Sequence, residues 1–292
     1  MRAERRLVGA VFGLALACSA LEARAYCRTT TDDSRSSPEG CLLDGRPLYW
    51  KSLCVGYRLN QDASRQFTLD EAHSIVRQAF AQWTNPGAVC VPSFSAFAQA
   101  PTASREVGYD PEGPNENLIV FRDEDWGQDA AIIQLTTVSF DQNTGEILDV
   151  DSEVNTNQHE FSTAQLRTVM THELGHFLGL SHSLEPGSIM QPSLDVLERP
   201  LPLLSLDDAE GICAIYPESG MRTTTDENGA ELVLAASECP PLAVDPGGET
   251  TCGPGSVEHG CSVSALPARV PASAGFALAL CGAALIARRR RR

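Results

Sequence analysis

The segment His172–His182, with the sequence HELGHFLGLSH, contains three of the six histidines in the chain and one glutamate. On a helix, His172 and His176 would lie one turn apart and project from the same face. Two imidazoles placed in this way can bind one tetrahedral zinc ion, and Glu173 would lie beside the first ligand, within reach of a bound water. Gly179 favours a left-handed backbone that ends a helix, and this turn can bring His182 back as the third ligand.

Three neutral ligands would leave the fourth zinc position open to a water molecule, whose pKa the metal lowers to about 7. The full pattern His-Glu-x-x-His-x-x-Gly-x-x-His would arise by chance in a chain of this length about once in 10⁵ sequences, so coincidence is a poor explanation. A structural zinc is the main alternative, but such sites usually have four protein ligands and no adjacent glutamate. The pattern therefore predicts a catalytic zinc.

Several helices and strands that would position this segment can be read from the sequence. Thr68 with Glu71, and Ser162 with Gln165, form capping boxes that begin two helices, the second of which carries the histidines. A short helix is expected at 205–216, and strands, the first of them edge-forming, are expected at 48–60, 117–123, 130–141 and 146–155. The turn at 141–145 would join the last two strands as a hairpin. This order predicts an α+β domain over residues 26–217.

The composition is strongly acidic, with 22 Lys and Arg against 38 Asp and Glu and a formal net charge of −16. A chain with this charge would repel a polyanion, so nucleic acid is excluded as a partner. Calcium is a candidate ligand at Asp149, Asp151 and Glu153, although alternating acids also suit a solvated strand face. The alternative reading of the acidity is plain solubility.

The N-terminal residues 1–25 have the pattern of an export signal: a basic stretch, an apolar run and small residues before a cut at Tyr26. A lipoprotein signal that uses Cys18 is the alternative. With Cys18 and Cys281 set aside, eight cysteines remain, and an oxidising compartment would pair them as structural disulfides. Eight cysteines allow 105 pairings, so the sequence leaves the connectivity open. They are Cys27, Cys41, Cys54, Cys90, Cys213, Cys239, Cys252 and Cys261.

Wider similarity supports the histidine motif. HELGHFLGLSH followed by SIM at 188–190 resembles the metzincin clan of zinc peptidases, in which Met190 would belong to the Met-turn beneath the metal. LDDAEGICAIYP at 206–217, with AFAQW and TGEILDVDSEVN, resembles the matrixins, the family of the matrix metalloproteases. Pro192 stands where astacins and serralysins have a tyrosine, which favours the matrixin branch. The matrixin propeptide motif Pro-Arg-Cys-Gly is missing.

The resemblance implies a twisted mixed sheet, an active-site helix, a Met-turn and a C-terminal helix. It also implies a zinc endopeptidase that acts on peptides or proteins, with Glu173 as general base and Asp207 and Asp208 supporting the Met-turn. Without the propeptide, we expect either an active secreted enzyme or a zinc-blocking thiolate from Cys27 or Cys41, and we favour disulfides for both. The alternative from another class is a catalytically silent surface protein with a structural zinc. We expect a monomer.

The C-terminal region divides into two parts. Residues 218–262 are rich in Thr, Pro and Gly and predict a linker or stalk. In residues 263–292, an apolar run at 272–287 precedes five arginines and is shorter than the roughly twenty residues of a membrane span. A plain membrane anchor is one reading. Cys261, a spacer, the apolar run and the arginines also resemble the C-terminal sorting tags of myxobacterial surface proteins, which implies processing and lipidation at Cys261 and outer-surface display.

Overall fold

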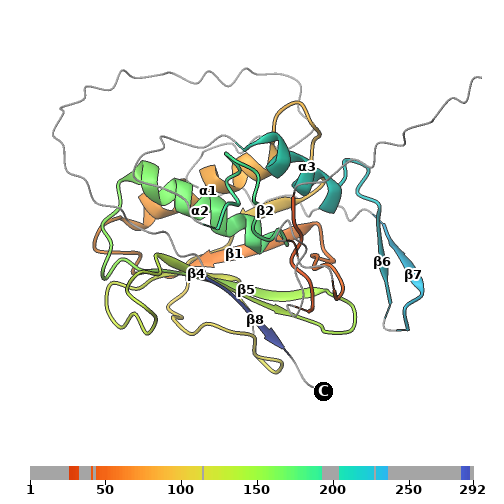
Figure 1. Cartoon of the computed structure of the whole chain (residues 1–292). Helices are drawn as coiled ribbons and strands as arrows, with labels where there is room; N and C mark the ends of the chain where they lie inside the picture. The colour runs from red at the N-terminus through yellow and green to blue at the C-terminus, as the bar shows by residue number, and fades with distance from the viewer. Residues whose placement is uncertain are drawn as a thin grey trace, which may run out of the picture.

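The computed structural model describes residues 26–32, 41, 44–113, 115–192, 204–226, 228–235 and 284–289. Three helices lie on one side of a sheet, and a separate hairpin lies beside them (Figure 1). The helices are α1 (Leu69–Thr84), α2 (Thr163–Phe177) and α3 (Leu206–Ile215). The strands are β1 (Cys54–Leu59), β2 (Ser95–Ala98), β3 (Leu118–Phe121), β4 (Gln134–Phe140), β5 (Ile147–Val154), β6 (Arg222–Thr225), β7 (Glu231–Leu234) and β8 (Ala284–Arg289).

Each helix begins at a capping box. Thr68 and Ser162 cap α1 and α2, and in both the side chain three residues later returns a hydrogen bond to the cap backbone, as predicted. Ser205 caps α3 in the same way, with Asp208 as its reciprocal partner. These boxes satisfy backbone N–H groups that would otherwise have no partner at the helix start, so the sequence determines locally where each helix begins.

The main sheet has the strand order β2-β1-β3-β5-β4-β8. Strands β2, β1, β3 and β5 run parallel, and β4 runs antiparallel to β5, which confirms the predicted hairpin. The expectation that the first strand lies at an edge is wrong, because β2 pairs with β1 from Cys54 to Tyr57. The α+β architecture, with helices against a mixed sheet, agrees with the prediction.

Two indole groups fix α2 to its surroundings from within the core. Trp83 of α1 donates from Nε1 to the Thr171 carbonyl at 2.8 Å, and Trp50 donates to the Phe177 carbonyl at 2.8 Å. Both indoles are buried, and Phe177 also contacts the Trp50 and Phe80 rings. Buried indole donors are stable only when they find acceptors. The two bonds therefore set the position of α2 over the sheet.

The region predicted as a linker begins with ordered structure. Strands β6 and β7 form an antiparallel hairpin, which stands apart from the sheet (Figure 1). The buried Arg222 donates to the backbone carbonyls of Trp50 and Lys51, and its guanidinium lies 5.8 Å from the Tyr216 ring centre. Packing against the core of the domain thus continues past residue 217.

At the other end of the chain, β8 pairs in parallel with β4 along Leu135–Phe140. No helix among the described residues is long and apolar enough to cross a membrane. The predicted signal at 1–25, Cys261 and most of the apolar run at 272–287 lie outside the described residues.

Candidate metal centre

Three histidines converge at the end of α2. His172 and His176 lie one turn apart on the helix, and His182 follows it on the next turn of the chain. Their potential ligand atoms all lie within 4.8 Å of one another, and the ring centres are 4.8 to 5.3 Å apart. His172 and His176 are buried, and His182 is partly exposed. Among the described residues, this is the one group of at least three histidine, cysteine, aspartate or glutamate side chains close enough to hold a metal.

Hydrogen bonds orient two of the rings. His172 Nδ1 lies 2.6 Å from the Ile189 carbonyl and His176 Nδ1 lies 2.9 Å from the Leu180 carbonyl. Since a carbonyl only accepts, each Nδ1 carries the proton and each Nε2 keeps a free lone pair. All three Nε2 atoms are buried and have no hydrogen-bond partner within the described part of the chain. Such atoms are costly to leave unsatisfied, and a metal ion bound by three Nε2 atoms fits them.

Burial also sets the charge of these rings. It lowers the pKa of His172 to about 3, lowers the pKa of His176 well below its ordinary value, and lowers that of His182 as well. Because the charged form is poorly solvated in this environment, all three imidazoles are neutral at neutral pH. The neutral ring is the form that binds a metal.

Glu173 lies next to the first histidine and is almost completely buried. Burial raises the pKa of its carboxyl to about 7, and a hydrogen bond with the Thr136 side chain opposes the shift. The second oxygen, Oε2, has no hydrogen-bond partner among the described residues. A carboxylate with a pKa near neutrality and one unpartnered oxygen is suited to take up and release a proton.

The turn after α2 requires a glycine. Gly179 has a φ of +96°, and a Cβ at this position would lie 2.9 Å from the Leu48 carbonyl oxygen. Two features thus require a glycine here: the left-handed backbone, which the sequence predicted, and the close approach of another segment. The turn reverses the chain and places His182 opposite the two helical histidines.

Met190 is buried beneath the histidines and packs against α2. A Cβ on Gly175 would overlap the Met190 sulfur and would lie 2.9 Å from both Met190 Cε and Trp83 Cζ2. The motif specifies neither residue between Glu173 and His176, so the sequence gives no reason for a glycine at position 175. The structure shows that a glycine is needed there for Met190 to approach the helix.

Asp208 holds the turn that contains Met190. Its carboxylate accepts hydrogen bonds from the Ser188 hydroxyl at 2.5 Å, the Ile189 amide at 2.9 Å and the Ser205 amide at 2.8 Å. The Ile189 carbonyl in turn accepts from His172, so one carboxylate connects α3 to a candidate ligand. This link is of the kind that orients metal ligands from outside the coordination sphere.

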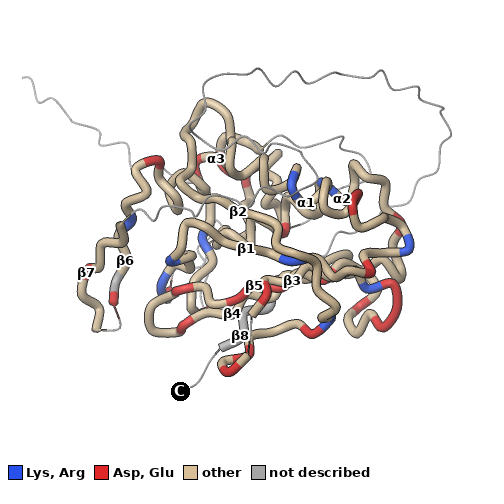
Figure 2. The backbone as a smooth tube through the Cα atoms, turned by 180° about the vertical axis from the view of Figure 1, so that it is seen from behind, with Lys and Arg blue, Asp and Glu red and all other residues tan. Residues whose placement is uncertain are grey.

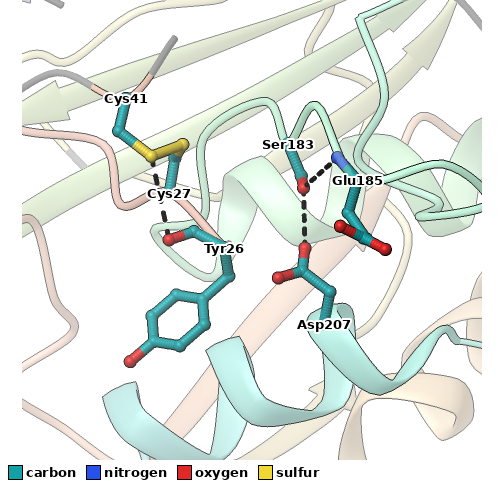
Figure 3. Close-up of a disulfide and its surroundings, with 6 residues drawn as sticks. All are labelled: Tyr26, Cys27, Cys41, Ser183, Glu185 and Asp207. Atoms are coloured by element: carbon teal, nitrogen blue, oxygen red, sulfur yellow. Dashed lines mark hydrogen bonds between the residues drawn. A yellow bond between two sulfur atoms is a disulfide. The ribbon is translucent and has the colours of Figure 1, made fainter. Parts of the chain in front are cut away.

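Asp207, the neighbouring residue, holds the segment that follows the third histidine. Its carboxylate accepts from the Ser183 hydroxyl at 2.6 Å, and Ser183 Oγ accepts from the Glu185 amide at 3.1 Å (Figure 3). Ser183 also donates from its amide to the Met190 carbonyl at 2.8 Å.

The disulfides agree with the predicted oxidised cysteines. Cys27 pairs with Cys41, Cys90 pairs with Cys213, and Cys54 is also disulfide-bonded. Because Cys27 and Cys41 are joined to each other, the alternative in which one of them blocks zinc as a thiolate is wrong.

The candidate calcium residues do not lie on a solvated face. Acidic residues recur along β5 (Figure 2), but Asp149 and Asp151 are buried and Glu153 forms an ion pair with Arg122 at 2.7 Å. Burial and the proximity of Asp151 raise the pKa of Asp149 to about 7, and burial also raises the pKa of Asp151. Asp151 thus disfavours the charged form of Asp149, in addition to the effect of burial.

A mixed sheet, an active-site helix with His-Glu-x-x-His-x-x-Gly-x-x-His and a buried methionine turn beneath the histidines together define a metzincin. Residues 49–217, more than half of the chain, match the family model for matrixin, and the chain therefore belongs to the matrixin family.

Two curated relatives are similar to this chain. Metalloendoproteinase 1-MMP of Arabidopsis thaliana is 26% identical over 175 residues, which cover 60% of this chain and 46% of that protein. Neutrophil collagenase of Homo sapiens is 48% identical over 48 residues, or 16% of this chain and 10% of that protein. The chain thus matches less than half the length of each relative.

Proposed function

We propose that the protein is a zinc-dependent endopeptidase that hydrolyses peptide bonds in proteins or peptides. The observation that carries this proposal is the cluster of three buried, unpartnered Nε2 atoms with the unpartnered Glu173 oxygen beside it. His172, His176 and His182 would hold the metal. Membership of the matrixin family, and the similarity to a metalloendoproteinase and to a collagenase, support the same activity.

Zinc, when bound, supplies a Lewis acid that polarises the scissile carbonyl and makes water a better nucleophile. Glu173 takes the proton from the attacking water at a carboxylate oxygen and then donates it to the leaving amine nitrogen, acting first as general base and then as general acid. The raised pKa of this carboxyl supports both roles. Its hydrogen bond with Thr136 keeps the carboxyl in place between the two transfers.

Substrate would bind as an extended strand along β4. Thr136 lies on β4 and contacts Glu173, so the backbone of this strand passes directly beside the reacting groups. Strand addition gives a peptide main-chain hydrogen bonds without sequence preference. Specificity would then come from side-chain pockets.

We propose that the segment after His182 forms the pocket beside the metal; residues 193–203 of this segment lie outside the described part of the chain. The apolar residues Leu194, Val196, Leu197 and Leu201 motivate the proposal that the side chain after the cut bond is apolar. A peptide library varied at this position tests it. Preference for a charged residue there would refute it.

Two experiments test the activity. Casein or gelatin cleavage should stop with a zinc chelator and return when zinc is added. Glu173→Ala should bind zinc as the unchanged protein does, yet lose activity by at least about 10²-fold. A Glu173→Ala protein with full activity would overturn the mechanism. Zinc binding without any cleavage by the unchanged protein would instead favour the silent binding protein.

We further propose that the enzyme is exported and acts at the cell surface as a monomer. The disulfides support an oxidising compartment. We propose that residues 1–25 are removed as a signal and that the chain is processed and lipidated at Cys261. Such processing would also remove β8 from β4. Mass spectrometry of the mature C-terminal peptide tests this, since recovery of intact GAALIA sequence would mean a plain anchor.

Calcium at Asp149, Asp151 and Glu153 stays a prediction. The carboxyl pair and the Arg122 ion pair account for these three side chains without a cation. Calorimetric titration of the purified protein with calcium tests whether the site takes a metal.

A further inference from the structure

The described N-terminal residues 26–32, which we call the strap, run between the ligand-bearing turn and a second segment of the chain. On the side away from the metal, the Leu48 amide donates to the Thr29 carbonyl at 2.8 Å and the Thr31 amide donates to the Arg46 carbonyl at 2.9 Å. The strap is thus held in the body of the domain on that side.

On the other side the strap pairs with the turn that follows α2. The Ser181 amide donates to the Cys27 carbonyl at 2.9 Å, and the Thr29 amide donates to the Gly179 carbonyl at 2.9 Å. These two bonds flank the antiparallel bridge between Arg28 and Leu180. The bonds and the bridge involve residues 179–181, which immediately precede His182. The strap therefore satisfies backbone groups of the turn that brings in the third candidate ligand.

The Thr29 hydroxyl contacts a backbone carbonyl that also contacts a candidate ligand. It is buried and donates to the Leu180 carbonyl at 3.0 Å. The same carbonyl accepts from His176 Nδ1 at 2.9 Å. Because one oxygen accepts both bonds, Thr29 fixes the acceptor that sets the plane and tautomer of the His176 ring.

A disulfide anchors the strap two residues before Thr29. Cys27 is buried and is joined to Cys41, and the Tyr26 ring lies alongside α3 (Figure 3). A Cβ on Gly211 of α3 would lie 3.1 Å from Tyr26, so this contact is tight. The start of the strap is thus fixed covalently and by packing.

We propose that the strap is a positioning element of the metal centre, in which Thr29 orients His176 through the Leu180 carbonyl and the Cys27–Cys41 disulfide keeps Thr29 in place. This inference rests on the proposed zinc function. It makes the oxidised state of one disulfide a determinant of zinc affinity.

The test compares Thr29→Val, which keeps the shape and removes the hydroxyl, with Thr29→Ser, which keeps the hydroxyl. Zinc affinity is measured by competition with a chromophoric chelator. We expect zinc binding about tenfold weaker in Thr29→Val and unchanged in Thr29→Ser. Thr30→Val is the matched control, because the Thr30 hydroxyl donates to the Asp32 carbonyl within the strap and not to the turn.

A spectroscopic measurement separates positioning from general stability. Cobalt(II) in place of zinc should give visible absorption bands that differ in Thr29→Val and agree with the unchanged protein in Thr30→Val. If Thr29→Val folds only with metal bound, the measured quantity is the rate at which zinc passes from the protein to the chelator. We then expect this rate to be about tenfold higher in Thr29→Val than in the unchanged protein.

The disulfide is tested with two paired variants. Cys27→Ser with Cys41→Ser should weaken zinc binding by about tenfold. Cys90→Ser with Cys213→Ser removes a disulfide whose cysteines are 123 residues apart, compared with 14 residues for Cys27–Cys41. This second pair should therefore lower the free energy of unfolding in urea by more than the first pair does, yet leave the zinc affinity unchanged.

The outcomes distinguish this inference from the proposed function. Unchanged zinc affinity and cobalt spectra in Thr29→Val, with an active unchanged protein, would overturn the positioning role and leave the peptidase intact. An unchanged protein that binds no zinc would overturn the proposed function itself.

Discussion

Met190 and Gly175 touch so closely that residue 175 has no room for a side chain. A Cβ there would overlap the Met190 sulfur and come within 2.9 Å of Trp83 Cζ2. Gly175 lies between Glu173 and His176, on the helix that carries both. Because of this contact, the position of the helix that carries the candidate ligands depends on the position of the turn that contains Met190.

Gly175→Ala should destabilise the protein by about 1–3 kcal/mol, because the added methyl group must displace Met190 or Trp83 from a packed core. Urea unfolding of the metal-free protein measures this. Gly127→Ala is the control, since a Cβ at Gly127 meets nothing within 4 Å, and its effect should stay within about 0.5 kcal/mol. Equal stabilities of the two variants would contradict the contact.

Asp208→Asn should lower both stability and zinc affinity. The amide group replaces an acceptor that the Ser188 hydroxyl and the Ile189 amide both need, and Ile189 in turn orients His172. We expect a loss of about 3 kcal/mol in unfolding free energy and weaker zinc binding by about tenfold.

Asp207→Asn is the matched control for this variant. Its carboxylate accepts from the hydroxyl of Ser183, which follows His182 in the chain but forms no hydrogen bond with a candidate ligand among the described residues, so the loss should be about 1 kcal/mol. Chelator competition and urea unfolding give both quantities. If Asp207→Asn weakens zinc binding as much as Asp208→Asn, the proposed route through Ile189 is wrong.

The carboxyl pair on β5 should make stability depend on pH. Because the folded state raises the pKa of Asp149 to about 7, its protonated form contributes stability that is complete below pH 4 and lost as the pH rises through about 7. While this group titrates, each pH unit changes the unfolding free energy by up to about 1.4 kcal/mol.

Asp149→Asn should remove the Asp149 contribution to this dependence and make the protein more stable than the unchanged chain at pH 8, whereas Asp151 and Glu173, whose pKa values are also raised, contribute in both proteins. Urea unfolding from pH 4 to 8 is the measurement. The buried histidines give the opposite trend at low pH, but they are common to both proteins and cancel in the difference. Glu124→Gln, at an exposed position, should leave the curve unchanged. A variant curve parallel to that of the unchanged protein would refute the raised pKa of Asp149.

Local features of the fold could be predicted and non-local ones could not. The capping boxes at Thr68 and Ser162 form hydrogen bonds only with residues of the same helix start, so four consecutive residues suffice to predict where the helix begins. The position of β1 between β2 and β3 depends on pairing with distant segments, and β2 itself has only four residues and no strong alternation. Strand order therefore needed the structure.

The candidate site divides in the same way. The three histidines and Glu173 could be predicted because the helical repeat alone brings His172 and His176 together. Thr136 and Gly175 could not, since each matters through a contact with a residue on another element. The alternating acids on β5 suggested either a calcium site or a solvated face, yet Asp151 is buried and accepts hydrogen bonds from the amides of Gly108 and Leu118.

Removing the C-terminal strand should increase activity. Strand β8 pairs with the edge of β4 that faces away from β5, and we propose that substrate adds at this same edge. One edge accepts one strand at a time, so β8 and substrate compete. A chain that ends at residue 235 should show a kcat/KM about tenfold higher, because KM falls; this factor corresponds to a competing interaction of about 1.4 kcal/mol.

A synthetic ALIARR peptide should inhibit the shortened enzyme competitively, and a peptide of the same composition in scrambled order should not. Equal kcat/KM values for the full and shortened chains would show that β8 does not compete with substrate.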